Sequence, residues 1–218
     1  MMSRDGLLSI LELLHRAGTE VVLAGGWGVD ALLGEQTREH RDVDLLHHRD
    51  QEPAVVAALT AAGYTETLDW RPARFVLSHP SGLEIDLHPM EFAPDGSALQ
   101  SSLDPAEPYH YPAECFVTGT IGGTEVRCVS AEQQALFHQG YEPADRDRHD
   151  MEQLRLRFGI ETPVRPPPRS PAARSGSAPR PAAAERADSG RATEFPRRAQ
   201  RIGTHCPTTQ VKRQQWGA

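Results

Sequence analysis

Lysine is absent from most of this chain. Residues 1–162 contain 12 arginines, 27 acidic residues and no lysine, which leaves a net charge of −15, and the one lysine of the 218-residue chain is Lys212. Arginine must therefore supply any cationic contact in this part, through a planar fork of donors rather than a point charge. A charge of −15 disfavours nucleic acid as a groove-bound partner. It suits a cationic small substrate, although solubility explains it equally well.

Cysteines and long apolar runs are also scarce. The three cysteines, Cys115, Cys128 and Cys206, are odd in number and do not have the spacing of a metal site. No apolar run approaches the roughly 18 residues of a membrane-spanning helix, and the sequence shows no signal-peptide pattern. We therefore expect a protein of the reducing cytoplasm that has no membrane partner.

The composition changes near Thr162-Pro163. Residues 163–218 carry 11 basic and 3 acidic residues, together with nine of the 18 prolines. They hold few large apolar residues and show no helical or strand period. Such a segment buries too little apolar surface to offset its chain entropy. We predict one globular domain at 1–162 and a disordered tail, rich in Pro, Arg and Ala, at 163–218.

Hydrophobic periodicity and turn residues predict the elements of the domain. Helices are expected around residues 7–14, 27–33, 53–62, 130–139 and 145–158, and strands at 20–24, 42–46, 75–78, 83–87, 116–121 and 125–129. Asp50 is a plausible N-cap of the third helix, and Ser130 with Gln133 forms a capping box. Helices and strands alternate early and hairpins come later. This order predicts an α+β (mixed α/β) fold, with helices flanking a mixed sheet and two helices at the C-terminal end.

Aspartates interrupt two of the apolar strands. They lie in the segments Arg41-Asp42-Val43-Asp44-Leu45-Leu46 and Gly82-Leu83-Glu84-Ile85-Asp86-Leu87. Strand side chains alternate between faces, so Asp42 and Asp44 point the same way. Two carboxylates about 4 Å apart repel by about 4 kcal/mol at an effective dielectric constant of about 20, which favours a cation between them. An all-oxygen site suits Mg²⁺ better than zinc or copper. The alternative is three solvated carboxylates at strand ends.

A Gly25-Gly26 pair follows the first strand and precedes a helix. Glycines at such a turn let backbone N–H groups approach a phosphate, and a helix N-terminus favours negative charge. A tight strand-to-helix turn would have the same sequence. With the acid pair on the next strand, however, a triphosphate on the turn would have its phosphates toward Asp42 and Asp44. Asp86 would complete a metal site or accept the proton of an attacking hydroxyl.

These motifs resemble the signature of antibiotic nucleotidyltransferases. The first reads Gly25-Gly26-Trp27-Gly28-Val29-Asp30-Ala31-Leu32-Leu33-Gly34, followed by Thr37-Arg38-Glu39-His40-Arg41-Asp42-Val43-Asp44. Later segments at 119–123, 126–130 and 138–142 are also similar. The resemblance covers about residues 5–160. It is to the aminoglycoside 2″-adenylyltransferase-like and lincosamide nucleotidyltransferase-like proteins of the polymerase-beta-type superfamily.

The resemblance implies both an activity and roles for residues. Asp42, Asp44 and Asp86 would be metal ligands, with Asp86 also the general base, and Gly25 and Gly26 would face the nucleotide phosphates. Arg38 would contact the phosphates as well; the alternative is a surface loop arginine.

The implied reaction is a transfer of a nucleotide monophosphate from ATP, or another nucleoside triphosphate, to a hydroxyl of a small molecule. It would depend on Mg²⁺, with two ions. The acceptor would be a cationic compound such as an aminoglycoside or a lincosamide. Two alternatives stay open: a nucleotidyltransferase that modifies a protein or tRNA, as in toxin and antitoxin systems, and a nucleotide-binding regulator without turnover.

Several other residues allow two interpretations. Trp27 would pack a helix against the sheet or stack on a base, and Asp30 would hold the 37–41 loop or be solvated. Neighbouring His47 and His48 would point to opposite faces of their strand, so they cannot join one zinc site. The stretch from Glu107 to Glu114 would be a surface loop or meet the acceptor.

Overall fold

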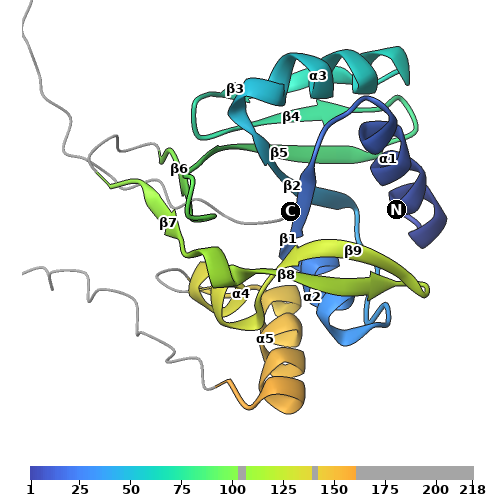
Figure 1. Cartoon of the computed structure of the whole chain (residues 1–218). Coiled ribbons are helices and arrows are strands. Elements are labelled where there is room, and N and C mark those ends of the chain that lie inside the picture. Colours follow the sequence, from blue (N-terminus) through green and yellow to red (C-terminus); the bar gives the residue numbers. More distant parts are fainter. Residues whose placement is uncertain (103–106, 139–141, 161–218) are drawn as a thin grey trace, which may run out of the picture. The chain divides into compact units, whose positions relative to one another are not determined.

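A computed structural model describes residues 1–102, 107–138 and 142–160 (Figure 1). The predicted domain boundary after Thr162 and the tail at 163–218 lie outside the described residues. Among the described residues, no helix combines the length and the apolar character needed to cross a membrane.

The described residues form an α+β domain, as predicted. The helices are α1 (Arg4–Arg16), α2 (Gly25–Leu33), α3 (Glu52–Ala61), α4 (Ala131–Phe137) and α5 (Asp145–Phe158), with short 3₁₀ turns at Arg49–Gln51 and Ala113–Cys115. The strands are β1 (Val21–Ala24), β2 (Asp42–His48), β3 (Thr65–Trp70), β4 (Arg74–Ser78), β5 (Glu84–Phe92), β6 (Ala98–Gln100), β7 (Tyr109–Tyr111), β8 (Phe116–Ile121) and β9 (Thr124–Val129).

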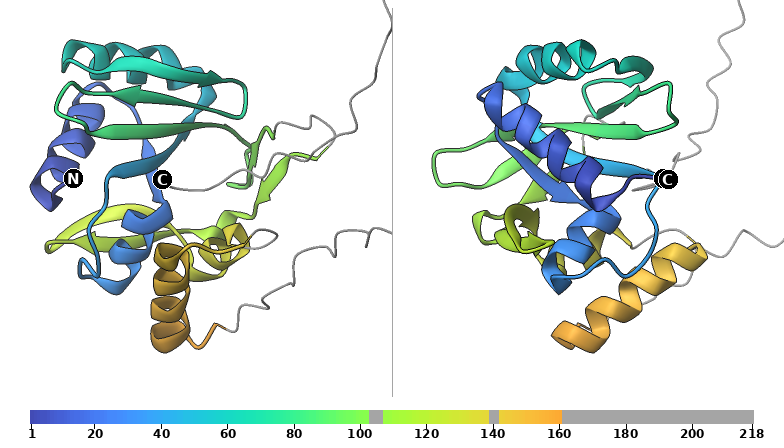
Figure 2. Two further views of the ribbon diagram at one scale, coloured as in Figure 1. Left: turned by 180° about the vertical axis from the view of Figure 1, so that it is seen from behind. Right: turned by 90° about the vertical axis from the view of Figure 1, so that its right-hand side faces the viewer.

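One mixed sheet organises the domain. Its order is β3-β4-β5-β2-β1-β9-β8. In addition, β6 pairs with β5 on one side and with β7 on the other. β2 runs parallel to β5 and antiparallel to β1, while β1 runs parallel to β9. Helix α1 contacts α3, and α2 contacts α4 and α5 beside β8 and β9 (Figures 1 and 2). The two strands that carry the aspartates are therefore adjacent at the centre of the sheet.

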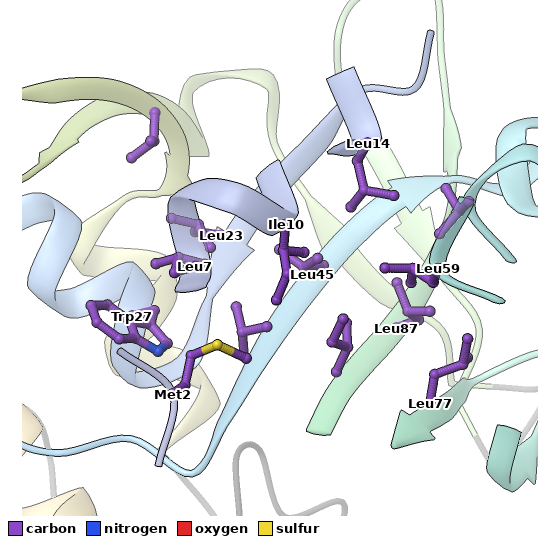
Figure 3. Packing of buried hydrophobic residues seen from close by; sticks show 14 of the residues in the cluster. Met2, Leu7, Ile10, Leu14, Leu23, Trp27, Leu45, Leu59, Leu77 and Leu87 are labelled. Atoms are coloured by element: carbon purple, nitrogen blue, oxygen red, sulfur yellow. The ribbon is translucent and has the colours of Figure 1, made fainter. Parts of the chain in front are cut away.

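The main hydrophobic core lies between the sheet and helices α1, α2 and α3. Leu7, Leu45 and Leu87 are fully buried there, from a helix and two strands (Figure 3). The alternating residues of β2 and β5 point to the other face, where Leu46 and Met90 belong to a second cluster. Strand side chains alternate between faces, so the burial of Leu45 and Leu87 in the main core directs Asp44 and Asp86 to the second face.

Three details differ from the sequence-based expectations. Asp50 does not cap α3, because a 3₁₀ turn intervenes and Gln51 takes the N-cap position without a side-chain bond to the helix. The side chain of Gln51 instead accepts a hydrogen bond from the Glu20 N–H. Helix α4 ends at Phe137. The Ser130 hydroxyl caps it by accepting from the Gln133 N–H, but the Ser130 N–H donates to the Cys115 carbonyl, so only half of the predicted capping box is present. Strands β3, β6 and β7 were not expected, since β3 is mostly exposed and lacks apolar alternation.

Candidate active site

Parallel pairing of β2 with β5 brings two of the three aspartates together. Asp44 is the register partner of Asp86, and Asp42 that of Glu84. The ligand atoms of Asp44, Asp86 and His88 all lie within 4.8 Å of one another, and all three side chains are buried. Asp42 is outside this cluster but lines a pocket of about 220 Å³ together with Asp86. The expected set of three acids is therefore brought together only in part, and His88 is the third member of the cluster in place of Asp42.

The buried carboxylates of Asp44 and Asp86 have too few hydrogen-bond donors around them within the protein. Oδ1 of Asp44 and Oδ1 of Asp86 are shielded from solvent and accept no hydrogen bond. Burial raises the pKa of Asp86 to about 6, and Asp44 and Asp42 add to this rise, while His88 and Arg74 oppose it. Buried, unsatisfied carboxylate oxygens are costly. The donor set therefore fits a hard divalent cation, which would bind these oxygens and offset their repulsion.

Arg74 is a second residue that the sequence did not point to. Its Nη1 donates to Oδ2 of Asp86, and its guanidinium lies 4.9 Å from the centre of the Trp70 ring. Arg74 and Asp42 line the same pocket. The guanidinium is thus a cation at the mouth of the acid cluster, where a phosphate group would also need one.

The glycine pair begins α2 and lies directly against the acid cluster. A Cβ atom on Gly25 would be 2.1 Å from Oδ2 of Asp44, and Gly25 has a positive φ of 57°. A Cβ atom on Gly26 would be 2.3 Å from Nη2 of Arg38 and 2.6 Å from the His40 ring. Only glycine lets the backbone come this close to the side chains of Asp44, Arg38 and His40. The structure thus brings together Gly25, Gly26, Arg38 and Asp44.

Arg38 forms an ion pair with α5, the last helix of the domain. Its Nε and Nη2 donate to the two carboxylate oxygens of Asp150 at 2.7 and 2.6 Å, a two-pronged ion pair across 112 residues of sequence. The Asp150 side chain is 3% exposed and that of Arg38 is 20% exposed. Helix α5 therefore fixes the guanidinium beside Gly26, which makes Arg38 more than a surface loop arginine.

Removing the charge of Arg38 is expected to destabilise the domain. Arg38→Met would leave the buried Asp150 carboxylate unpaired and lower the free energy of unfolding by about 3 kcal/mol. Adding Asp150→Leu to this variant should restore much of the loss. Urea unfolding measures both. The control is Arg16→Met, which removes an exposed pair with Glu12 and should cost less than about 0.5 kcal/mol. Equal losses in Arg38→Met and Arg16→Met would contradict the assignment.

Asp30 organises the loop that carries Arg38. Its Oδ1 accepts from the backbone N–H and the hydroxyl of Thr37, and its Oδ2 lies 2.5 Å from Nε2 of His40. The His40 ring in turn lies 4.4 Å from the Trp27 ring, and Trp27 is buried in the core. Of the two interpretations for each residue, the structure supports the loop-holding role of Asp30 and the packing role of Trp27.

Within residues 1–102, 107–138 and 142–160, His88 is the one histidine whose ring joins the acid cluster. His47 and His48 point to opposite faces, as predicted, since His47 contacts the Phe75 ring and His48 stacks on Phe92. The stretch from Glu107 to Glu114, for which a surface loop and an acceptor contact were the two interpretations, contains β7, and Tyr111 of this strand is buried. Of the two missed site residues, only His88 had a sequence signal, because it lies two positions after Asp86 on one strand face.

Comparison with known proteins gives consistent matches. The model of the aminoglycoside-2″-adenylyltransferase family matches residues 6–154. A lincosamide resistance protein of Staphylococcus haemolyticus is 34% identical over 149 residues, which cover 68% of this chain and 92% of that protein.

Solved structures show the same fold. The lincomycin-bound crystal structure of the lincosamide antibiotic adenylyltransferase LnuA aligns with a TM-score of 0.66 and 32% identity, over 71% of this chain and 97% of that one. The solution structure of the antibiotic-resistance factor ANT(2″)-Ia aligns with a TM-score of 0.55 over 70% of this chain and 82% of that one. At 20% identity, that second likeness concerns the fold alone.

Proposed function

Because this chain belongs to the aminoglycoside-2″-adenylyltransferase family, whose members are nucleotidyltransferases, we propose that it transfers the adenylyl group of ATP to a hydroxyl of a small-molecule antibiotic and releases pyrophosphate. The observation that carries this proposal is the buried Asp44–Asp86 pair against the Gly25 turn. Membership of the family implies a nucleoside triphosphate and a divalent metal ion as reactants. ATP as the nucleotide, and two Mg²⁺ ions, are the specific form that we propose.

The metal ions would be held by Asp44 and Asp86, with Asp42 as a third carboxylate at the edge of the pocket. When bound, Mg²⁺ neutralises charge on the phosphates and orients them for in-line displacement. The carboxylates are oriented before binding, since each lies on a central strand whose opposite face is buried in the core. The all-oxygen pair of Asp44 and Asp86 favours a hard cation.

The chain itself would position the triphosphate and the acceptor. Backbone N–H groups at the start of α2 bind anions well, because they have no partner within the helix. Arg38 lies against Gly26 and Arg74 contacts Asp86, and guanidinium groups at these two places suit charge-assisted contacts to phosphate oxygens. Asp86 lies in the pocket that Asp42 and Arg74 line. We assign Asp86 the further role of accepting the proton from the attacking hydroxyl.

We propose a lincosamide as the first acceptor to test. Two relatives above 30% identity are described by lincosamides, whereas the likeness to ANT(2″)-Ia lies at 20%. An aminoglycoside is the second candidate, because the matching family is described by that activity. The acidic character of residues 1–162 favours either acceptor class, since both carry amines.

Product analysis tests this function. Purified protein would be incubated with ATP, Mg²⁺ and either lincomycin or an aminoglycoside panel, and analysed by mass spectrometry and pyrophosphate release. We expect a lincosamide whose mass increases by one adenylyl group, and no product when EDTA removes the metal. If an aminoglycoside alone is modified, the acceptor proposal is wrong while the reaction proposal stands.

The alternative functions make different predictions in the same assay. A transferase for protein or tRNA would label a macromolecule from radioactive ATP in a cell lysate and leave the antibiotics unchanged. A regulator would bind ATP without releasing pyrophosphate in the presence of any acceptor. Either result would overturn the proposal. The cytoplasmic location stays a prediction.

A further inference from the structure

A chain of buried polar side chains leads from β7 to the acid cluster. The hydroxyl of Tyr111 donates to Oε1 of Gln100 at 2.6 Å. Nε2 of Gln100 lies 3.1 Å from the carbonyl oxygen of Ala73 and 3.1 Å from Nδ1 of His88. Gln100 is 0% exposed, Tyr111 1% and His88 3%. None of these groups can exchange its partner for water, so their hydrogen-bond directions depend on one another.

The orientation of the Gln100 amide follows from its partners. The carbonyl of Ala73 can only accept, so the Gln100 atom facing it must be the NH₂ group. The two hydrogens of that group then point to the Ala73 oxygen and to Nδ1 of His88. The remaining oxygen of Gln100 accepts from the Tyr111 hydroxyl. Each group in this arrangement has a complementary partner.

The amide in turn fixes the tautomer of His88. Because Gln100 donates to Nδ1, that nitrogen must offer its lone pair, and the ring hydrogen is on Nε2. A hydrogen on Nδ1 would face a hydrogen of the amide inside the core. Nε2 of His88 lies 3.5 Å from Oδ1 of Asp44 and 3.5 Å from Oδ1 of Asp86. Its N–H therefore faces these two carboxylates, at a separation that forms a hydrogen bond with neither in the absence of a bound ion.

We propose that His88 is a positioning residue that directs its Nε2–H at the Asp44 and Asp86 carboxylates and is not a ligand of the metal ion. The inference rests on the proposed function, because it concerns the ion held by these two acids. A nitrogen that carries a hydrogen has no lone pair for a metal. The N–H instead faces one oxygen of each carboxylate and so fixes which oxygens remain for the ion.

The tautomer can be measured without metal or substrate. Nitrogen-15 NMR of histidine-labelled, metal-free protein would identify the ring nitrogen that carries hydrogen, and the signal missing from a His88→Gln variant would be assigned to His88. We expect the hydrogen on Nε2 of wild-type His88. A hydrogen on Nδ1 would overturn the proposal. If His88→Gln does not fold, Gln100→Glu shifts the same signal and provides the assignment.

The Gln100→Glu variant reverses the arrangement at nearly constant volume. A carboxylate at position 100 can only accept from the ring, so the hydrogen should move to Nδ1 and expose the Nε2 lone pair to the metal. The expected result is an adenylyl transfer rate about 10- to 100-fold lower. A purely structural role for His88 would leave the transfer rate unchanged although the hydrogen has moved to Nδ1, and that result would count against the proposal.

Mn²⁺ in place of Mg²⁺ reports directly on ligation. Pulsed electron paramagnetic resonance of the protein with Mn²⁺ and ATP should show no imidazole nitrogen coupling in the wild type. The same coupling should appear in Gln100→Glu. Coupling in the wild type that disappears in His88→Gln would make His88 a ligand and overturn the inference. A wild-type protein that binds no Mn²⁺ with ATP would instead overturn the proposed function, while the NMR result still decides the tautomer.

Discussion

Replacing Asp44 by Asn is expected to lower the rate of adenylyl transfer by about a thousand-fold, which corresponds to about 4 kcal/mol of transition-state stabilisation. Asn keeps the shape of the side chain and removes the negative charge, so the metal ions lose a ligand from the buried pair with Asp86. Metal ions supply several kcal/mol of charge stabilisation in phosphoryl transfer. Initial rates of pyrophosphate release at saturating ATP and acceptor would measure the loss.

Stability measurements separate a catalytic loss from unfolding. Removing one of two like charges in a buried site relieves repulsion, so Asp44→Asn should leave the melting temperature unchanged or higher. The control is Asp95→Asn, the same chemical change in the exposed turn between β5 and β6, which should retain full activity. Wild-type activity in the folded Asp44→Asn protein would rule out the acid pair as the catalytic centre.

A methyl group at Gly25 is expected to displace Asp44 and to inactivate the enzyme. The new Cβ would lie 2.1 Å from Oδ2 of Asp44, so the carboxylate must move by about an ångström. A misplacement of about 1 Å in a reacting geometry can cost about 100-fold in rate. The free energy of unfolding should also fall by about 2–5 kcal/mol, because strain at positive φ adds to the overpacking. Enzyme kinetics and urea unfolding measure these two effects.

Gly18 provides a matched control for the backbone strain. Its φ is 72°, and a Cβ there would meet no atom within 4 Å. Gly18→Ala should therefore lose only the strain term of about 1–2 kcal/mol and keep its activity. If Gly25→Ala and Gly18→Ala were equally active, the close approach of the turn to Asp44 would have no role in catalysis.

The sequence was informative wherever a local pattern determined the type of an element or the face to which a side chain points. Alternation along 42–46 and 83–87 predicted the strands and the shared face of Asp42 and Asp44, and the structure has both. Gly34 and Gly159 directly follow the predicted helices at 27–33 and 145–158, and both end their helices in the left-handed conformation. The prediction failed for β3, because an exposed edge strand needs no apolar alternation to form its hydrogen bonds.

Pairings between distant segments were not readable in advance. Arg38 and Asp150 are separated by 112 positions, and no local pattern connects that arginine with α5. Likewise, Gln100 faces His88 only because β6 folds back along β5. Contacts of this kind depend on strand order and register, which many sequences with the same local patterns could satisfy differently.

By itself, the sequence determined the candidate site residues: a glycine pair before a helix, two aspartates on one strand face and a third on another apolar strand. Covalent spacing and the alternation of side chains are local, so they hold before any tertiary contact forms. Only the tertiary structure decided which side chains lie next to these residues. Parallel pairing of β2 with β5 placed Asp44 beside Asp86. One nitrogen of His88 faces both acids, because Gln100 and His88 are buried and cannot form hydrogen bonds with water instead.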